Sequence, residues 1–145
     1  MLFGARWVWM AAAFLPFAAI GCGGGPSPVG VTGEVTLDGQ PLPSGMVVFE
    51  PAVGSDGQRR DANIAAGRFA LPDDQGMLPG QEFQVVLKAF RQTGRKYLNA
   101  DMGSSADEME QYLPKQYNSS STLHVTISPD AKKNHYAFHL VSGPE

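Results

Sequence analysis

The chain has 145 residues, 14 of them acidic and 11 basic, and its net charge at pH 7 is −3. A net negative charge argues against nucleic acid as a partner, because nucleic-acid-binding domains carry clustered basic side chains. The length suits one domain with a modest core. The 17 glycines and 11 prolines, with apolar residues in short runs between them, favour many short strands over long helices.

The N-terminal segment has the layout of a secretory signal. One basic residue, Arg6, precedes an uncharged and mostly apolar run from Trp7 to Ala19 that ends in small residues. Pro16 interrupts this run, which also falls short of the roughly 20 apolar residues that a transmembrane helix needs. We therefore expect residues 1–21 to be a signal peptide, whose removal leaves 124 residues with 10 basic and 14 acidic side chains.

Cys22 is the only cysteine, and it follows Ala19-Ile20-Gly21. This order resembles a bacterial lipobox, in which a small residue precedes a cysteine whose thiol receives a diacylglyceryl group. Ala19 departs from that pattern, where leucine is preferred, and Ala19 with Gly21 also fits the small pair cut by an ordinary signal peptidase. Both routes cut before Cys22. An exported chain with one cysteine has no disulfide to form, which favours lipid attachment at Cys22 over a free thiol.

Residues 22–28 are expected to form the lipidated cysteine and a flexible tether, and residues 29–145 a single domain. Each buried acyl methylene contributes about 0.8 kcal/mol, so two or more chains, palmitate among them, hold stably in a membrane. Gly23 stands where enterobacterial lipoproteins retained in the inner membrane carry aspartate. We therefore expect an exported protein that is anchored in the outer membrane and faces the periplasm.

Alternation of apolar and polar residues with a period of two predicts strands along the first part of this domain. The expected strands before residue 72 are 29–37, 46–50, a less regular polar strand within 56–66, and 67–71. Asp38-Gly39 marks a turn after the first strand. The longest predicted strand, Glu82 to Gln92, has apolar side chains on both faces, which favours a central position in a sheet.

Residues 93–122 contain no clear strand, and so long an excursion is functional, partly helical or flexible. Ser105-Ala106-Asp107-Glu108 has the form of a capping box and predicts a short helix from Ala106 to Tyr112, ended by Pro114. An ordered excursion with exposed aromatic side chains would favour ligand binding, whereas a disordered one would favour a spacer.

The last two predicted strands are 123–128 and 135–140, and the polar turn 129–134 between them predicts a C-terminal hairpin. The predicted fold is therefore all-β: an antiparallel, seven-stranded, prealbumin-like or Ig-like β-sandwich, with one short helix in the excursion before the last two strands.

Several segments carry a resemblance to a known family. They are Val31 to Leu42, Gly45 to Pro51, Gly67 to Phe69, Pro79-Gly80, and Leu113 to Asn118 running into Thr122-Leu123. With the lipobox-like start, the chain resembles the small lipoproteins, abundant in Planctomycetes, that carry a carboxypeptidase-regulatory-like or transthyretin-like sandwich. The resemblance implies a fold and a location, and a domain that usually serves as a non-catalytic binding or structural module. Leu113 and Tyr117 are interpreted as packing residues that pin the excursion to the sandwich edge.

Two histidines are weak candidates for a metal site. If Ile127 pairs with Tyr136, His124 lies opposite His139, with Cβ atoms about 4.5 to 5.5 Å apart. A zinc or copper site needs a third or fourth ligand, but His135 is two pairs away and no carboxylate is placed to assist. We therefore expect no metal and no cofactor.

The sequence thus predicts a lipid-anchored cell-envelope module with a non-catalytic binding or structural role and no catalytic residues. Its expected partners are membrane lipid, through acylated Cys22, and an envelope protein or glycan. A carbohydrate- or peptide-binding accessory domain is the alternative. A hydrolase similar to the transthyretin-like enzyme of ureide metabolism is more distant, because the Tyr-Arg-Gly-Ser ending of that family is replaced by Val141-Ser142-Gly143-Pro144-Glu145.

Overall fold

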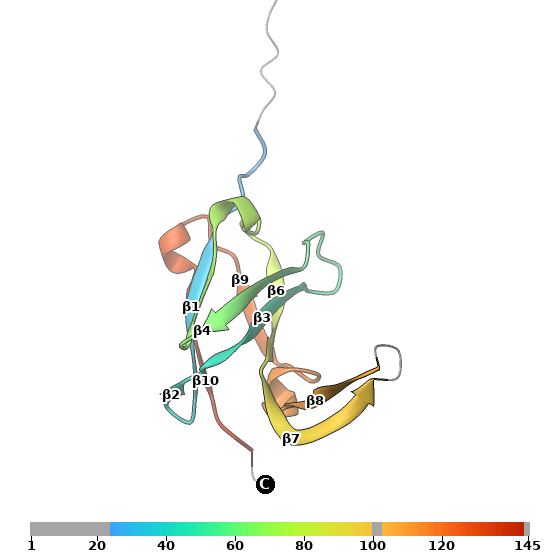
Figure 1. The fold of residues 1–145 in the computed structure, drawn as a ribbon. Helices are drawn as coiled ribbons and strands as arrows, with labels where there is room; N and C mark the ends of the chain where they lie inside the picture. Colours follow the sequence, from blue (N-terminus) through green and yellow to red (C-terminus); the bar gives the residue numbers. More distant parts are fainter. Residues whose placement is uncertain (1–23, 100–102, 144–145) are drawn as a thin grey trace, which may run out of the picture.

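The computed structural model describes residues 24–99 and 103–143 and shows a mostly antiparallel β fold (Figure 1). One eight-stranded sheet has the strand order β10-β1-β5-β4-β3-β6-β9, with β2 beside β1, and β7 and β8 form a separate two-stranded ribbon. The strands are β1 Val31–Leu37, β2 Gln40–Pro41, β3 Ser44–Pro51, β4 Arg60–Ala65, β5 Arg68–Leu71, β6 Glu82–Lys88, β7 Phe90–Asn99, β8 Ser104–Gln111, β9 Leu123–Thr126 and β10 His135–Leu140. Three 3₁₀ turns connect them: η1 Asp73–Gln75, η2 Lys115–Tyr117 and η3 Ala131–Lys133.

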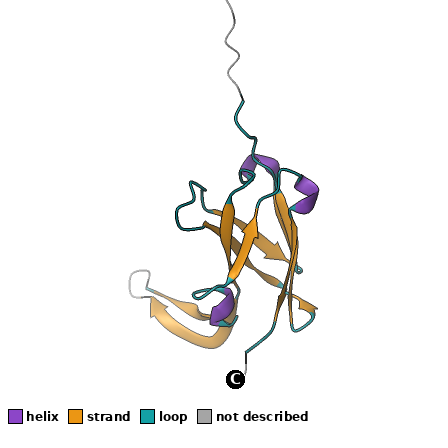
Figure 2. Cartoon of the chain, turned by 180° about the vertical axis from the view of Figure 1, so that it is seen from behind, coloured by secondary structure: helices purple, strands orange, loops and turns teal. Residues whose placement is uncertain are grey.

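The large sheet curls into a half-barrel, which Figure 2 shows from behind. Where the chain turns from β4 into β5, the two strands are joined by a single residue pair, Ala65 with Arg68. β10 runs parallel to β1, whereas the other neighbouring strands of the sheet run antiparallel. The prediction of an all-β, mostly antiparallel fold is confirmed at this level.

The core is formed by the inward-facing residues of these strands. The rings of Phe49 and Phe138 each lie 6.1 Å from the ring of Phe69, so three strands meet through aromatic contacts. Gly33, in the middle of β1, leaves room for the Phe69 ring. The buried side chains alternate along each strand with exposed or differently facing neighbours, as seen at Val31, Val35, Phe49 and Phe69. The period of two seen in the sequence therefore places one face of each strand in the core.

The predicted strands before residue 72 correspond to β1, β3, β4 and β5. The Asp38-Gly39 turn is also present, and both residues have positive φ, 52° and 80°, as the tight turn of a hairpin requires. The longest predicted strand is interrupted: β6 ends at Lys88, and after Ala89 the chain leaves the large sheet as β7. The expected 82–92 strand is thus two strands that belong to different sheets.

The predicted helix from Ala106 to Tyr112 is wrong, because this segment belongs to strand β8, which pairs with β7. Ser105 lies opposite Leu98, and the Glu108 carboxylate accepts a hydrogen bond of 2.7 Å from the Thr93 hydroxyl across the ribbon. The Glu108 carboxylate of the apparent capping box is therefore used between strands. The segment forms the backbone hydrogen bonds of a strand pair here, although its local sequence favours a capped helix.

The predicted C-terminal hairpin is also wrong. β9 pairs with β6 and β10 pairs with β1, so Ile127 does not lie opposite Tyr136. The buried side chain of Asn134 closes the intervening loop, since it accepts from the Ser128 N–H at 2.8 Å and donates to the Ser128 carbonyl at 2.9 Å. The Asn134 carbonyl accepts from the Thr32 N–H at 3.0 Å, which directs the following strand onto β1.

Candidate functional site

Cys22, the predicted lipid-attachment residue, lies outside the described residues, so its acylation stays a prediction. The chain enters the described domain from a tether at one end of the half-barrel (Figure 1). Among the residues that the structure describes, none of the helical segments has the length and apolar character needed to cross a bilayer.

The structure separates the histidines that were weak candidates for a metal site. His124 is on β9 and His139 on β10, which are the two ends of the strand order. His139 Nδ1 lies 3.0 Å from the Thr36 hydroxyl, and His124 Nδ1 lies 3.6 Å from a Glu82 carboxylate oxygen. Within residues 24–99 and 103–143, no group of three or more His, Cys, Asp or Glu side chains is placed to hold a metal ion. The proposed opposition of His124 and His139 is therefore wrong, because it depended on the C-terminal hairpin.

Four of the seven exposed large apolar side chains in the described part of the chain lie on the β7–β8 ribbon. The exposed fractions of its large apolar side chains are 51% for Phe90, 53% for Tyr97, 74% for Leu98 and 52% for Met109. The ribbon extends from the end of the domain away from the tether, as both views of the chain show (Figures 1 and 2). The described part of the 93–122 excursion thus carries an exposed aromatic side chain, Tyr97, on an ordered strand, an arrangement that favours binding.

Charged pairs line the ribbon. Arg91 lies 3.5 Å from Glu110, and Lys96 lies 3.7 Å from Asp107. These exposed pairs contribute little stability, about 0–1 kcal/mol each. They place charge along both strands, and the ribbon is irregular between Gln92 and Lys96, two features by which natural proteins discourage pairing with a foreign strand. The exposed faces of the ribbon are therefore better suited to contact a partner than its edges are.

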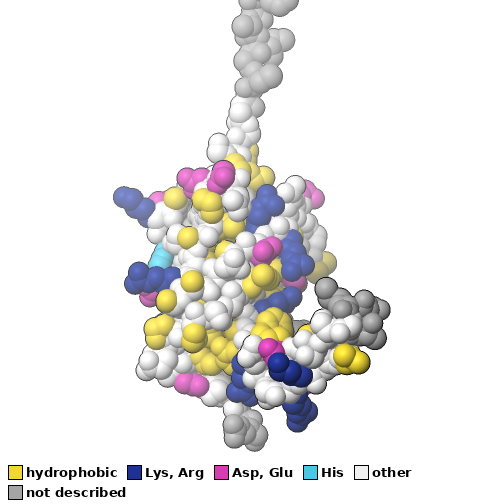
Figure 3. Space-filling model, viewed as in Figure 1, with side chains coloured by type: hydrophobic (Ala, Val, Ile, Leu, Met, Phe, Trp, Pro, Cys, Tyr) yellow, Lys and Arg dark blue, Asp and Glu magenta, His cyan; other side chains and the backbone are white. Residues whose placement is uncertain are grey.

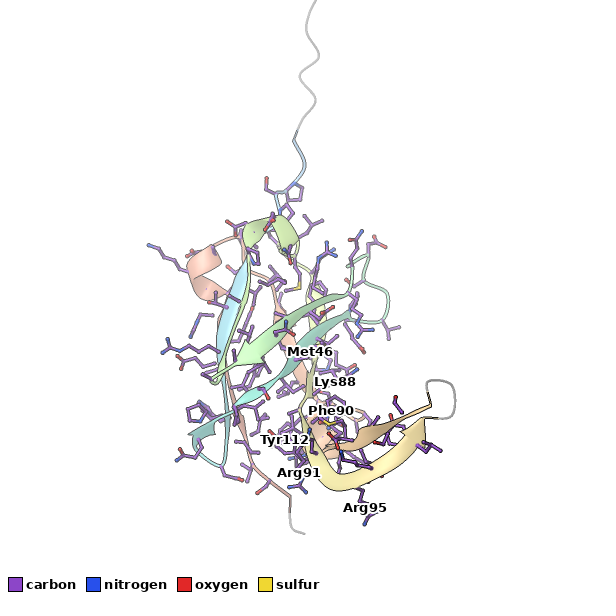
Figure 4. All side chains as sticks on the ribbon, viewed as in Figure 1. Met46, Lys88, Phe90, Arg91, Arg95 and Tyr112 are labelled. Atoms are coloured by element: carbon purple, nitrogen blue, oxygen red, sulfur yellow. The ribbon has the colours of Figure 1, made fainter. Side chains whose placement is uncertain are left out.

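The base of the ribbon is fixed firmly to the large sheet. The Gln111 side chain accepts from the Ala89 N–H at 2.8 Å and donates to the Leu87 carbonyl at 3.3 Å. The Tyr112 N–H donates to the Ala89 carbonyl at 3.2 Å. The Arg91 guanidinium lies 5.7 Å from the centre of the Tyr112 ring, and Figure 4 shows both side chains beside the start of β7.

A groove of about 420 Å³ lies at this base, between the outer face of β6, the start of the ribbon and the loop after η2. Its lining residues are Glu50, Gln84, Val86, Lys88, Phe90, Gln111, Asn118 and Ser119. Figure 4 shows Met46, Lys88 and Phe90 following one another from β3 toward the ribbon. Hydrophobic side chains on this face lie among basic and acidic ones (Figure 3).

Val86 forms the floor of the groove, which is apolar although it faces away from the core. Val86 of β6 lies directly opposite Val48 of β3, and their exposed fractions are only 7% and 0%. Their alternating neighbours Val47, Phe49, Val85 and Leu87 belong to the core on the other face. The two valines thus form a small second apolar cluster, of which only Val86 reaches the groove, because Val48 is fully buried.

One wall of the groove is the loop that follows η2. The Asn118 amide donates to the carbonyls of Leu113 and Pro114, both at 3.0 Å, and Leu113 itself is buried. The Ser121 hydroxyl donates to the Val85 carbonyl, and the Tyr117 hydroxyl accepts from the Val141 N–H at 3.1 Å. These contacts agree with the interpretation of Leu113 and Tyr117 as packing residues that position the strand beginning at Leu123.

The lining of the groove suits binding. It offers a carboxylate (Glu50), an ammonium group (Lys88) and a half-exposed aromatic ring (Phe90) around an apolar floor. Sequence reasoning missed this site, although apolar residues on both faces of the 82–92 segment were its visible trace. No family model, curated protein or solved structure matches the chain.

Proposed function

We propose that this chain is an exported, lipid-anchored module of the cell envelope that has no enzymatic role and binds a partner through its ribbon and groove. The observation that carries the proposal is the concentration of exposed apolar side chains on the ordered β7–β8 ribbon. Exposed apolar side chains gathered on one element of a small domain are typical of an interaction site.

The position of the ribbon also supports this function. An acyl chain on Cys22 would hold the tether end of the domain next to the lipid surface, and the ribbon lies toward the other end (Figures 1 and 2). A ribbon in that place would extend into the aqueous space and not into the bilayer. Its partner is then a periplasmic or envelope macromolecule, and an accessory role in binding a peptide or a carbohydrate is the specific form of the proposal.

The resemblance to small lipoproteins with a sandwich domain is also part of the proposal. The single residue pair between β4 and β5 supports a division of the half-barrel into two packed sheets, β10-β1-β5 and β4-β3-β6-β9. Two such sheets would make the sandwich of the carboxypeptidase-regulatory-like or transthyretin-like lipoproteins, with the ribbon as an insertion before β9.

Photo-crosslinking in intact cells tests the binding role. A photoreactive residue at Leu98 or at Met109 should give an adduct of the same mass, because both positions are exposed on the ribbon. Val53, fully exposed in the loop between β3 and β4, is the control position and should give none. Adducts of equal yield at all three positions, or at none of them, would contradict a binding role for the ribbon.

The anchor is tested separately. The protein purified from membranes should have the mass of the chain from Cys22 plus its acyl groups, and a Cys22→Ala chain should move to the soluble fraction. An unmodified mass for a protein found in the soluble fraction would exclude the anchor and leave the crosslinking result unaffected.

A further inference from the structure

We propose that the groove binds an extended polypeptide segment in which one apolar side chain lies between an acidic and a basic residue, each two positions away from it. The inference rests on the proposed function, because it takes this face as the binding face, and it chooses a ligand class for it. It is carried by the positions of Lys88, Glu50 and Val86, all three of which line the groove.

The first step concerns charge. Lys88 lies opposite Met46, and Glu50 lies opposite Gln84, so the two charged residues stand four residues apart along the strand direction. Four residues of extended chain span about 13 Å. Neither charge forms an ion pair with another residue of the described part of the chain. The groove thus has an unneutralised cation at one end and an unneutralised anion at the other.

The second step concerns the floor between these charges. Val86 is two residues from Lys88, and Val48, directly opposite Val86, is two residues from Glu50. An extended peptide turns every second side chain to the same side. Its residues i, i+2 and i+4 therefore match the spacing of the ammonium group, Val86 and the carboxylate. An acidic, an apolar and a basic side chain in these three positions would meet complementary groups.

The third step separates a peptide from a glycan. Sugar recognition needs polar side chains that are free to bond many hydroxyl groups, but the amides here already bond the protein's own backbone. Gln111 uses both its oxygen and its nitrogen, Asn118 does the same, and the Gln84 nitrogen donates to the Ser121 carbonyl. The groups left over are mainly the two charges, the Phe90 ring and the apolar floor, which suit a charged peptide better.

Methyl NMR of the full chain, purified in detergent with ¹³C-labelled valine methyl groups, tests the inference. The probe is a capped peptide in which aspartate, leucine and lysine alternate with threonine. Its isomer has the same composition with aspartate and lysine adjacent, and chitohexaose is the carbohydrate probe. The test peptide should shift the Val86 methyl signals saturably and bind several-fold more tightly than its isomer.

A charge reversal sharpens the test. Lys88→Glu should weaken binding of the test peptide about two- to five-fold and strengthen binding of a peptide with lysine on both sides of leucine by a similar factor. Lys132→Glu, in η3, makes the same change in net charge and should alter neither affinity. A change of preference cannot result from misfolding, and unchanged core methyl signals provide an independent check.

Each other result overturns the inference. Equal binding of the test peptide and its isomer would show that the charge spacing is not recognised. Saturable shifts with chitohexaose alone would assign the groove to a glycan, and no saturable shift with any probe would leave it without this ligand. If ribbon crosslinks persist in any of these cases, the proposed function stands and only the ligand assignment falls; if the crosslinks are absent too, both fall.

Discussion

The side-chain amide of Gln111 pairs with the backbone of Ala89 as a neighbouring strand would, with its Oε1 accepting the Ala89 N–H at 2.8 Å while its Nε2 donates to the Leu87 carbonyl at 3.3 Å. β9 pairs with β6 only as far as Val85, so the next backbone groups of β6 have no strand beside them on that side. The Gln111 side chain of the ribbon therefore provides hydrogen-bond partners for the backbone at the end of β6 and fixes the ribbon to the large sheet.

Replacing Gln111 by alanine should release the base of the ribbon. The buried Ala89 N–H loses its acceptor, and we expect the free energy of unfolding to fall by about 1–3 kcal/mol. Chemical denaturation measures the loss, and faster hydrogen exchange of the Ala89 amide locates it. Gln92→Ala is the matched control, because Gln92 lies on the same strand pair and bonds only the exposed Asp107 side chain, at 3.3 Å. If the Ala89 amide exchanged no faster in Gln111→Ala than in Gln92→Ala, Gln111 would not hold the ribbon.

Local patterns predicted the strands well because each depends on a few neighbouring residues. The alternation around Val31 and Val35 has to bury one face wherever the strand lies, and it produced β1. The pairing of strands depends on distant residues. Nothing near Ile127 or Tyr136 in the sequence indicates that β9 joins β6 while β10 joins β1.

The same distinction applies to the candidate site. The sequence shows that Val86 is apolar on the outer face of a strand, but the relation of Lys88 to Glu50 exists only once the register of β3 and β6 is known. The ribbon was missed for another reason. Ser105 and Glu108 satisfy a local helix signal equally well, and only pairing with β7 gives the Glu108 side chain another partner, the Thr93 hydroxyl.

Gly33 should not tolerate a side chain. A Cβ atom at this position would overlap the Tyr136 carbonyl oxygen and the Phe69 ring. Backbone and a buried aromatic ring cannot both move away, so Gly33→Ala should lower the free energy of unfolding by about 1–3 kcal/mol or more. Thermal or chemical unfolding measures it. Gly25→Ala, in the tether with no atom within 4 Å of the added Cβ, should leave stability unchanged, and equal stability of the two variants would contradict this account.

Asp38 should make stability depend on pH under acidic conditions. Hydrogen bonds from the Ser142 hydroxyl and backbone N–H lower the pKa of this carboxyl below its usual value of 3.8. The folded state therefore favours the ionised form, so the contribution is present above pH 3.8 and is lost as the pH falls through the lower folded value. An NMR titration of the Asp38 carboxyl should give a pKa below 3.8, and Ser142→Ala should bring this pKa back toward 3.8. A midpoint at or above 3.8 in the parent chain would refute the contact.

The hydrogen bonds of the Asn118 side chain should hold the loop wall of the groove in its shape. Its amide nitrogen donates to the Leu113 and Pro114 carbonyls, and its oxygen accepts from the Ser119 N–H at 2.7 Å. Asn118→Asp keeps the acceptor but puts a carboxylate oxygen beside two carbonyl oxygens in place of a donor. The free energy of unfolding should fall by about 1–3 kcal/mol at neutral pH, as expected for unpaired buried acceptors.

The variant also separates the shape of the groove from its charge. A displaced loop should weaken binding of the test peptide even though Lys88, Glu50 and both valines are unchanged. Ser119→Ala removes only an exposed hydroxyl from the same wall and should leave stability within about 0.5 kcal/mol. At acidic pH the introduced carboxyl becomes protonated and can donate one hydrogen bond again, so part of the lost stability should return. If Asn118→Asp were as stable as Ser119→Ala at neutral pH, the amide would not hold the wall, and the groove would have to be formed by β6 and the ribbon alone.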